Sequence, residues 1–265
     1  MNQKSKISAI VVTFNEEKRI FECLQSLNFC DEIIVVDLGS KDNTLEIIDK
    51  FSVRLINGQH VKFGELAMIS VLDFTKHDWV LSQDPDEVFP KSLISQVDFL
   101  LNNQDLAKIY LPIKYYFLNR PLNGTIWGGR RYKDRFFNKR KVNISPNVHR
   151  EINILHNYYS VKIPFEKNNF IQHYWVDSIP QLFRKHLRYI VAEGETRYNE
   201  GQRFNLFAFL SSTIRAFIDN LIKFKGLKDG VFGFFLSLFY SWYVGMCYLS
   251  LLVYQISTSI KNWKQ

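Results

Sequence analysis

The sequence predicts an α/β fold: a doubly wound, mostly parallel sheet followed by an apolar helical region. Over the first 90 residues, short β-branched runs alternate with stretches of helical periodicity, which is typical of successive strand–helix units. Near the other end of the chain, residues 230–260 contain no charged side chain. We therefore expect two domains, residues 1–176 with the sheet and residues 177–265 with the apolar helices.

The predicted units follow one another along the chain. A strand over residues 7–12 leads to Asn15-Glu-Glu, which is typical of a helix cap followed by acids in the first turn. A second strand, residues 32–37, ends on Asp37 and is followed by a turn that contains glycine. We expect further strands over residues 52–56 and 79–82, and a helix near residues 64–75.

Composition limits the possible partners. The chain has 265 residues, of which 46% are hydrophobic, so it can bury a sizeable core, and its net charge of +8 indicates an anionic partner: nucleic acid, a phosphorylated small molecule or a membrane surface. Three cysteines without metal-type spacing favour a reducing compartment. The apolar run at residues 7–12 is too short for a secretory signal, so we expect the protein to face the cytoplasm.

Three of the predicted strands end in polar clusters: Asn15-Glu16, Asp37 and Asp84-Pro85-Asp86. In a parallel sheet these ends share one edge, where open α/β sheets bind ligands. Two carboxylates and phosphate oxygens suit Mg²⁺ or Mn²⁺. An acidic turn is the alternative for Asp84-Pro85-Asp86, but the convergence favours a metal–diphosphate site. The glycine-rich dinucleotide and NTPase motifs are absent from the sequence.

Three segments carry a resemblance to a known family. The stretches IVVTFNEE (residues 10–17), DEIIVVDLGSKD (31–42) and DWVLSQDPDE (78–87) resemble family 2 glycosyltransferases of the Rossmann-like GT-A fold. The bacterial subgroup that builds lipopolysaccharide core and related surface glycans is the most similar. Weaker similarities follow at Arg135-Phe-Phe, VHRE (148–151), His173-Tyr and KDGVFG (228–233).

This resemblance implies an inverting, metal-dependent transferase. The enzyme would move a sugar from a nucleotide-diphosphate donor, a UDP-sugar, to a hydroxyl of a lipid-linked or surface-glycan acceptor. Asp84 and Asp86 would bind Mg²⁺ or Mn²⁺ on the diphosphate. The residues implied for the nucleotide are Thr13, Asn15, Glu16, Asp37, Ser40 and Asp84.

Other site residues are expected further along the chain. His173 lies in a strand-like segment, where it would either complete the metal shell or be a core histidine. The subgroup has Ala where this chain has Pro85, and it has His directly before Glu where Arg150 separates His149 from Glu151. We take Glu151 and His149 as the candidate bases, with Asp134 third; a structural histidine and a surface acid are the alternatives.

The middle of the chain is basic and aromatic, with Trp127 among the arginines and lysines of residues 120–141. Such a segment can clamp a diphosphate and stack a sugar, bind single-stranded nucleic acid, or form a solvated loop. The motifs upstream favour the phosphate–sugar interpretation, so we expect no nucleic-acid partner.

The C-terminal region has three candidate helices. Residues 178–197 and 204–224 are amphipathic, and the uncharged run at 230–260 is long enough to span a bilayer. Lysines flank this run on both sides, which fits a helix lying in the interface of an anionic leaflet. Ser237, Ser241 and Gly245 form a ridge for close packing. A true span and a buried core helix are the alternatives; we expect a peripheral or monotopic protein at the cytoplasmic face of the inner membrane.

Two other functions fit the same front half. A polyprenyl-phosphate glycosyl synthase would use a phosphate acceptor. A non-catalytic sugar-nucleotide-binding protein would act as a scaffold.

Overall fold

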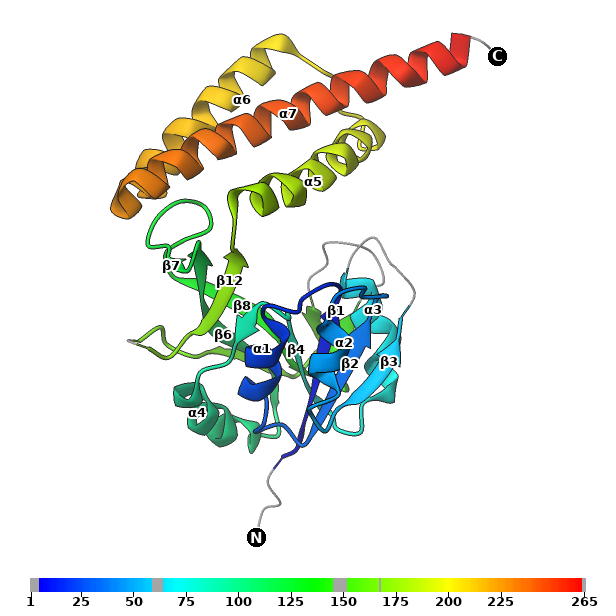
Figure 1. Ribbon diagram of the computed structural model, residues 1–265, viewed down its shortest axis with the longest axis vertical. Helices are drawn as coiled ribbons and strands as arrows, with labels where there is room; N and C mark the ends of the chain where they lie inside the picture. The colour runs from blue at the N-terminus through cyan, green and yellow to red at the C-terminus, as the bar shows by residue number, and fades with distance from the viewer. Residues whose placement is uncertain (1–4, 59–63, 145–151, 167, 264–265) are drawn as a thin grey trace. The chain divides into compact units, whose positions relative to one another are not determined.

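The computed structural model describes residues 5–58, 64–144, 152–166 and 168–263 (Figure 1). The chain divides into two compact units. Unit 1 consists of Met1–Lys114 and Arg130–His173, and unit 2 of Tyr115–Gly129 and Tyr174–Gln265. The segment 115–129 thus belongs with the C-terminal helices, although it lies within the first domain that the sequence predicts.

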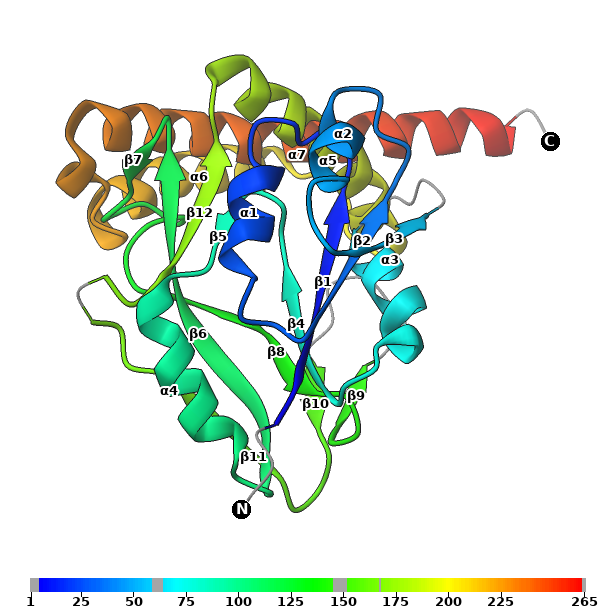
Figure 2. The same cartoon turned by 60° about the horizontal axis from the view of Figure 1, so that its bottom comes forward.

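The first half of the sheet is parallel, as predicted. Strand β1 (Ile7–Thr13) lies between β2 (Glu32–Asp37) and β4 (Trp79–Gln83), and β3 (Arg54–Asn57) pairs with β2 (Figure 2). All three inner strands are buried along almost their whole length, which explains their continuous apolar runs. The register places Thr13 beside Asp37 and Val11 beside Gln83, so the polar ends of these strands meet at one edge.

Beyond β4 the sheet is mostly antiparallel. Strand β8 (Arg131–Asn138) pairs with both β4 and β6 (Leu106–Phe117). Next to β6 lies β12 (Ile171–Val176), which pairs with β5 (Glu87–Val88). The remaining strands are short: β7 (Arg120–Pro121) pairs with β6, β11 (Tyr159–Lys162) pairs parallel to β6 as the exception among the described pairings, and β9 (Val142–Ile144) and β10 (Ile152–Ile154) form a hairpin pair.

The helices of unit 1 are short. They are α1 (Ile20–Ser26), α2 (Thr44–Ile48), α3 (Gly64–Val71) with the 3₁₀ turn η1 (Leu72–Phe74), and α4 (Lys91–Leu101). Helix α1 begins after Arg19, so the prediction of Asn15 as its cap is wrong. Asn15 instead has φ +56°, a left-handed conformation that asparagine tolerates, and its side chain accepts the Lys41 N–H at 2.7 Å.

One core of unit 1 lies between α3 and the sheet. Ala67, Met68 and Val71 of α3 pack with side chains from seven strands, five of the main sheet and the short pair β9 and β10. The buried strand residues of this cluster are Ile10, Ile34, Val36, Val80, Ala107, Phe137, Val142 and Ile152. Because both the parallel and the antiparallel strands contribute, the two halves of the sheet share one core and hold each other in register.

Unit 2 is built on three helices: α5 (Ile179–Asn199), α6 (Leu206–Ile218) and α7 (Gly230–Trp263). The π-helical turn η2 (Asp219–Lys223) and the 3₁₀ turn η3 (Gly226–Asp229) join α6 to α7. Small residues bring the helices close. A Cβ at Gly194 of α5 would lie 2.3 Å from Ser250 Oγ, and Ser241 Oγ donates to the Thr213 carbonyl of α6 at 2.8 Å.

The loop over residues 118–129 is fastened to these helices. Asp229 accepts the N–H groups of Asn123 and Gly124 at 2.7 and 2.8 Å, and Asn220 accepts that of Ile126 at 2.6 Å. Within the loop, Trp127 stacks on Trp175 at 4.7 Å and packs against the apolar core of unit 2. Trp127 is therefore partly buried against this core, with Trp175 as its stacking partner, and sugar stacking by this side chain stays a prediction.

We expect Gly194→Leu to lower the free energy of unfolding by about 1–3 kcal/mol, because the added side chain overpacks the contact with Ser250. Glu195→Leu is the matched control, since this neighbouring side chain is exposed and its replacement should change stability by only about 0.5 kcal/mol. Urea denaturation of both variants measures the difference. Equal effects would contradict the close packing of α5 on α7.

Candidate functional site

The loops that follow β1 and β2 are locked together by polar contacts. The Asn15 N–H donates to Ser40 Oγ at 2.9 Å. Asp37 accepts three hydrogen bonds from the loop that follows it: the N–H groups of Gly39 and Ser40 at 2.9 and 3.0 Å, and the Ser40 hydroxyl at 2.5 Å. The Glu16 N–H donates to Thr44 Oγ1 at 2.8 Å. The structure thus brings together four residues that the sequence predicts for the nucleotide.

Two buried polar atoms at this edge have no hydrogen-bond partner among the described residues. They are Thr13 Oγ1, at the end of β1, and Gln83 Oε1, at the end of β4. Both residues are about 1% exposed. A buried polar group is costly unless water or a ligand satisfies it, so both atoms favour a ligand site here. Gln83 also lines a cavity of about 180 Å³ together with Asp84 and Arg135.

The motif Asp84-Pro85-Asp86 forms a tight turn at the carboxyl end of β4. The Glu87 N–H donates to the Asp84 carbonyl at 3.1 Å, which puts Pro85 at the second position, where its fixed φ is favourable. The Asp84 N–H donates to Glu87 Oε2 at 3.1 Å. The turn interpretation and the ligand-site interpretation are therefore compatible: the turn presents both aspartates at the ligand-binding edge of the sheet.

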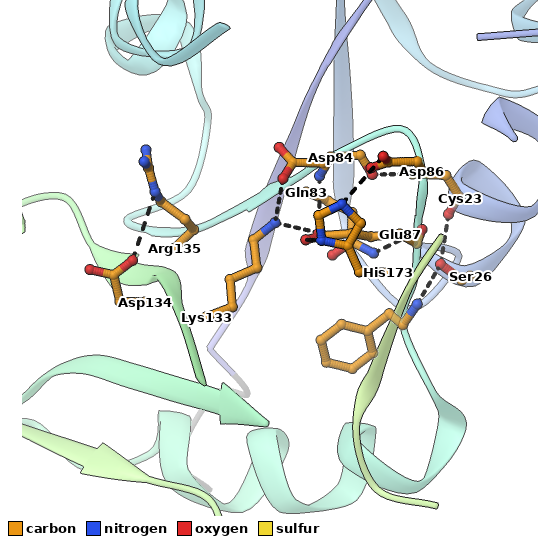
Figure 3. Close-up of polar contacts among 11 residues, drawn as sticks. Cys23, Ser26, Gln83, Asp84, Asp86, Glu87, Lys133, Asp134, Arg135 and His173 are labelled. Atoms are coloured by element: carbon orange, nitrogen blue, oxygen red, sulfur yellow. Dashed lines mark hydrogen bonds and ion pairs between the residues drawn. The ribbon is translucent and has the colours of Figure 1, made fainter. Parts of the chain in front are cut away.

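A buried lysine sits among these acids (Figure 3). The Lys133 ammonium donates to Glu87 Oε2 and lies 3.5 Å from Asp84 Oδ2. Lys133 and Glu87 are only 6% and 1% exposed. Burial raises the pKa of Glu87 to about 7, with Lys133 acting in the opposite direction. For Asp84, desolvation is the largest effect and acts to raise the pKa, but Lys133, His173 and Arg135 together outweigh it and the pKa is lowered.

His173 faces the same turn from β12. Because β12 pairs His173 with Glu87, the imidazole reaches both acids: Nε2 lies 3.3 Å from Asp86 Oδ2, and Nδ1 lies 3.6 Å from Glu87 Oε1. Burial acts to lower the pKa of His173, but Asp86, followed by Glu87 and Asp84, outweighs it, and the pKa is raised. The structure thus brings all three predicted metal residues to one turn.

The donor set fits a divalent metal in part. Within the described ranges, no group of three or more His, Cys, Asp or Glu side chains is arranged as a metal cage. Asp86 and His173 are the close pair at 3.3 Å, while Asp84 faces Lys133. Carboxylate oxygens and an imidazole nitrogen are suitable ligands for Mn²⁺, and Mg²⁺ usually keeps several positions for water and phosphate oxygens. An incomplete protein shell is therefore compatible with either ion.

Of the three candidate bases, only Asp134 lies among the described residues. His149 and Glu151 lie outside the described residues. Asp134 is paired with the buried Lys108 ammonium at 3.1 Å and lies 3.8 Å from Arg135 Nε.

Sequence reasoning missed Glu87 and Lys133 as site residues. It noted Lys133 only as part of a basic stretch. Lys133 reaches Asp84 and Glu87 because β8 pairs antiparallel with β4, and no local pattern predicts that pairing. The sequence around Lys133, Arg-Tyr-Lys-Asp-Arg, is typical of a solvated basic stretch and gives no local signal that this lysine is buried beside an acid.

Comparison with known proteins identifies a family. The model of Glycosyl transferase family 2 matches residues 8–156, more than half of the chain. An uncharacterized glycosyltransferase of Rickettsia conorii is 26% identical over 246 residues, which cover 89% of this chain and 86% of that protein. The lipopolysaccharide core biosynthesis glycosyltransferase LpsC of Rhizobium meliloti is 28% identical over 114 residues, 40% of each chain.

Among solved structures, residues 1–349 of TarS from S. aureus in complex with UDP-GlcNAc are 27% identical to the matched part of this chain, with a TM-score of 0.37. The match covers 42% of this chain and 35% of that one. The chain therefore spans about a third of this TarS structure.

We expect Lys133→Met to lower the free energy of unfolding by about 3–5 kcal/mol, because it leaves Glu87 buried without its cation. Arg140→Met is the control: it removes the exposed pair with Asp78, 2.8 Å apart, and should cost about 1 kcal/mol or less. Chemical denaturation at neutral pH tests both. A Lys133 variant as stable as the Arg140 variant would show that the buried pair does not support the fold.

Proposed function

Because this chain belongs to glycosyl transferase family 2, we propose that it transfers a sugar from a UDP-sugar to a hydroxyl group of a lipid-linked or surface-glycan acceptor, with inversion at the anomeric carbon. Its sheet follows the GT-A fold expected of that family. The observation that carries the proposal is the meeting of Asp84, Asp86 and His173 at the edge where β1 and β2 also end. Similarity to LpsC supports a lipopolysaccharide-core type of acceptor.

The donor nucleotide would bind over the loops after β1 and β2. The locked loops of Asn15, Asp37 and Ser40 offer a rigid surface to the base and ribose, which reduces the entropy lost on binding. Thr13 Oγ1 is buried there and would take a ligand hydrogen bond without losing another partner among the described residues. Glu16 would line the same pocket.

Asp84, Asp86 and His173 would hold Mg²⁺ or Mn²⁺. When bound, such an ion neutralises the negative charge that develops on the departing diphosphate. Lys133 would have a separate task. Its ammonium lies beside Asp84 and Glu87, so it balances the acidic turn whether or not an ion is present. Arg135 lines the same cavity as Asp84 and would contact phosphate oxygens.

The acceptor hydroxyl needs a base to take its proton. We propose Glu151 or His149 for this role on the sequence alone. Asp134 is a weaker candidate because the Lys108 ammonium already neutralises it.

We place the protein at the cytoplasmic face of the inner membrane. The three cysteines, Cys23, Cys30 and Cys247, are free thiols, which fits a reducing compartment. Among the described helices, Gly226–Ile260 is long and apolar enough to cross a membrane by length and composition. A lipid-linked acceptor would be presented at the same surface.

We expect Asp86→Asn to reduce UDP-sugar hydrolysis and sugar transfer by about 100-fold or more, since a carboxylate that would bind the metal is lost. Activity is measured on a panel of UDP-sugars with Mn²⁺, using glycan and polyprenyl-phosphate acceptors. Asp49→Asn, at an exposed position outside the site, is the control. Binding of UDP and Mn²⁺ by calorimetry without turnover of any donor would favour the scaffold function, and turnover only with polyprenyl phosphate would favour the synthase.

Metal affinity should rise with pH. The pKa of His173 is raised above its usual value of about 6.5, so below that raised pKa an ion must displace a proton from the imidazole. The affinity for Mn²⁺ in the presence of UDP should then increase by about tenfold per pH unit and level off above the pKa. His173→Ala should bind more weakly and without this slope, and His77→Ala should behave as wild type. Calorimetric titrations across neutral pH measure the Mn²⁺ affinity of each variant. If the affinity of His173→Ala rises with pH as steeply as that of wild type, His173 is not a ligand.

A further inference from the structure

Unit 2 exposes large apolar side chains along α7. The most exposed are Val231 at 83% and Val253 at 66%, followed by Leu238, Ile256 and Ile260 at about half. These positions are separated by steps of three and four residues or by sums of such steps, so they form one stripe along the helix. Of the most apolar window of this helix, only 33% is buried, which argues against a core helix of a soluble protein.

The stripe runs between the two helices that flank α7. Helix α6 contacts α7 at Ser241, and α5 contacts it at Ser250. These two residues are nine positions apart, which at about 100° per residue puts them on opposite sides of α7. Leu238 lies about 60° around the helix from Ser241, and Val253 about 60° from Ser250. Both lie on the side of α7 that neither neighbour covers. The three helices therefore form a layer with α7 in the middle.

Helix α6 adds its own exposed apolar set to the same side of this layer. Around α6, these side chains lie about 60–140° from Thr213, the residue that contacts α7. Around α7, the stripe lies at a similar angle from Ser241, the residue that contacts α6, in the same direction of rotation. The two helices are antiparallel, so the same angle measured from their mutual contact directs both sets of side chains to the same side of the layer. The exposed members on α6 are Phe207 at 83%, Leu210, Ile214 and Ile218. Val191 of α5, 73% exposed, extends the face on the other flank.

Positive charge surrounds this apolar face. Lys223, Lys225 and Lys228 are exposed at the turn between α6 and α7, and Arg184 and Arg188 are exposed on α5. Unit 2 contains 12 lysines and arginines and six acids, so it carries +6 of the net charge of +8. An apolar face with a basic rim fits the interface of an anionic lipid layer: the apolar side chains enter the hydrocarbon, and the basic side chains contact the anionic headgroups.

We propose that unit 2 docks on an anionic bilayer through this face, with α7 lying in the membrane plane. The packing of α5 argues against a span. It contacts α7 along residues 239–254, the middle of the apolar run, and its six central charges would enter the hydrocarbon with it: Arg184, Lys185, Arg188, Glu193, Glu195 and Arg197. Buried charge of this kind is very costly in lipid. In the plane, the uncharged apolar sides of α6 and α7 enter the interface, and the charges of α5 stay at its edge among the headgroups.

The docking is tested with the full-length protein and vesicles. Wild type should float with vesicles of phosphatidylcholine and phosphatidylglycerol and bind pure phosphatidylcholine more weakly. Phe207→Glu/Val231→Glu should weaken binding by at least about tenfold, because it puts two charges into the interface. Phe99→Glu is the matched control: Phe99 is 80% exposed, but on α4 of unit 1. Circular dichroism checks that each variant is folded.

Two outcomes would overturn the proposal. If the double variant floats like wild type, the face does not bind lipid. In the other outcome, wild type does not float but is a dimer by light scattering, and the double variant is a monomer. The face then binds a second copy of the chain instead of lipid. No sugar donor is present in either measurement, so the result is independent of the proposed transfer.

A labelling experiment distinguishes an α7 that lies in the membrane plane from an α7 that spans the bilayer. In a Cys30→Ser background, Lys228→Cys and Ser259→Cys place thiols near the two ends of α7, at exposed positions. An impermeant maleimide added outside the vesicles should label both variants. Protection of one end until detergent is added would show a span and overturn the in-plane arrangement.

Discussion

The contact of the Lys133 ammonium with Glu87 and Asp84 is the interaction on which the candidate site depends. Three acids within four residues repel one another, and one of them is almost completely buried. A buried carboxylate needs a cation nearby, and here it comes from β8, which is distant in sequence but paired with β4. The antiparallel half of the sheet thus makes the acidic turn of the parallel half possible.

Charge is distributed differently in the two units. In unit 1, opposite charges are brought together around the turn after β4, where we propose that the nucleotide donor binds. In unit 2, small residues such as Gly194 let three helices approach closely, and the apolar side chains that remain lie on one uncovered face with cations at its rim. The same chain therefore offers a polar ligand site and an apolar docking face.

Local sequence signals predicted the parallel strands well, because buried β-branched runs such as residues 32–37 have few alternatives. They failed where a residue has two local options. Asn15 suits a helix cap and a left-handed turn equally, and its contact with Lys41 from the next loop decides for the turn. Trp127 suits a sugar platform and a core, and the packing against the core comes from Trp175, almost fifty residues away, which no local pattern predicts.

By itself, the sequence determined the strand–helix order and the acids at the strand ends, because periodicity and turn chemistry act over a few residues. It also determined that residues 230–260 would be uncharged along their whole length. Only the tertiary structure decided that Lys133 and His173 join the aspartates, since strand pairing across the sheet sets those distances. It likewise decided which face of α7 stays uncovered, because that depends on where α5 and α6 pack.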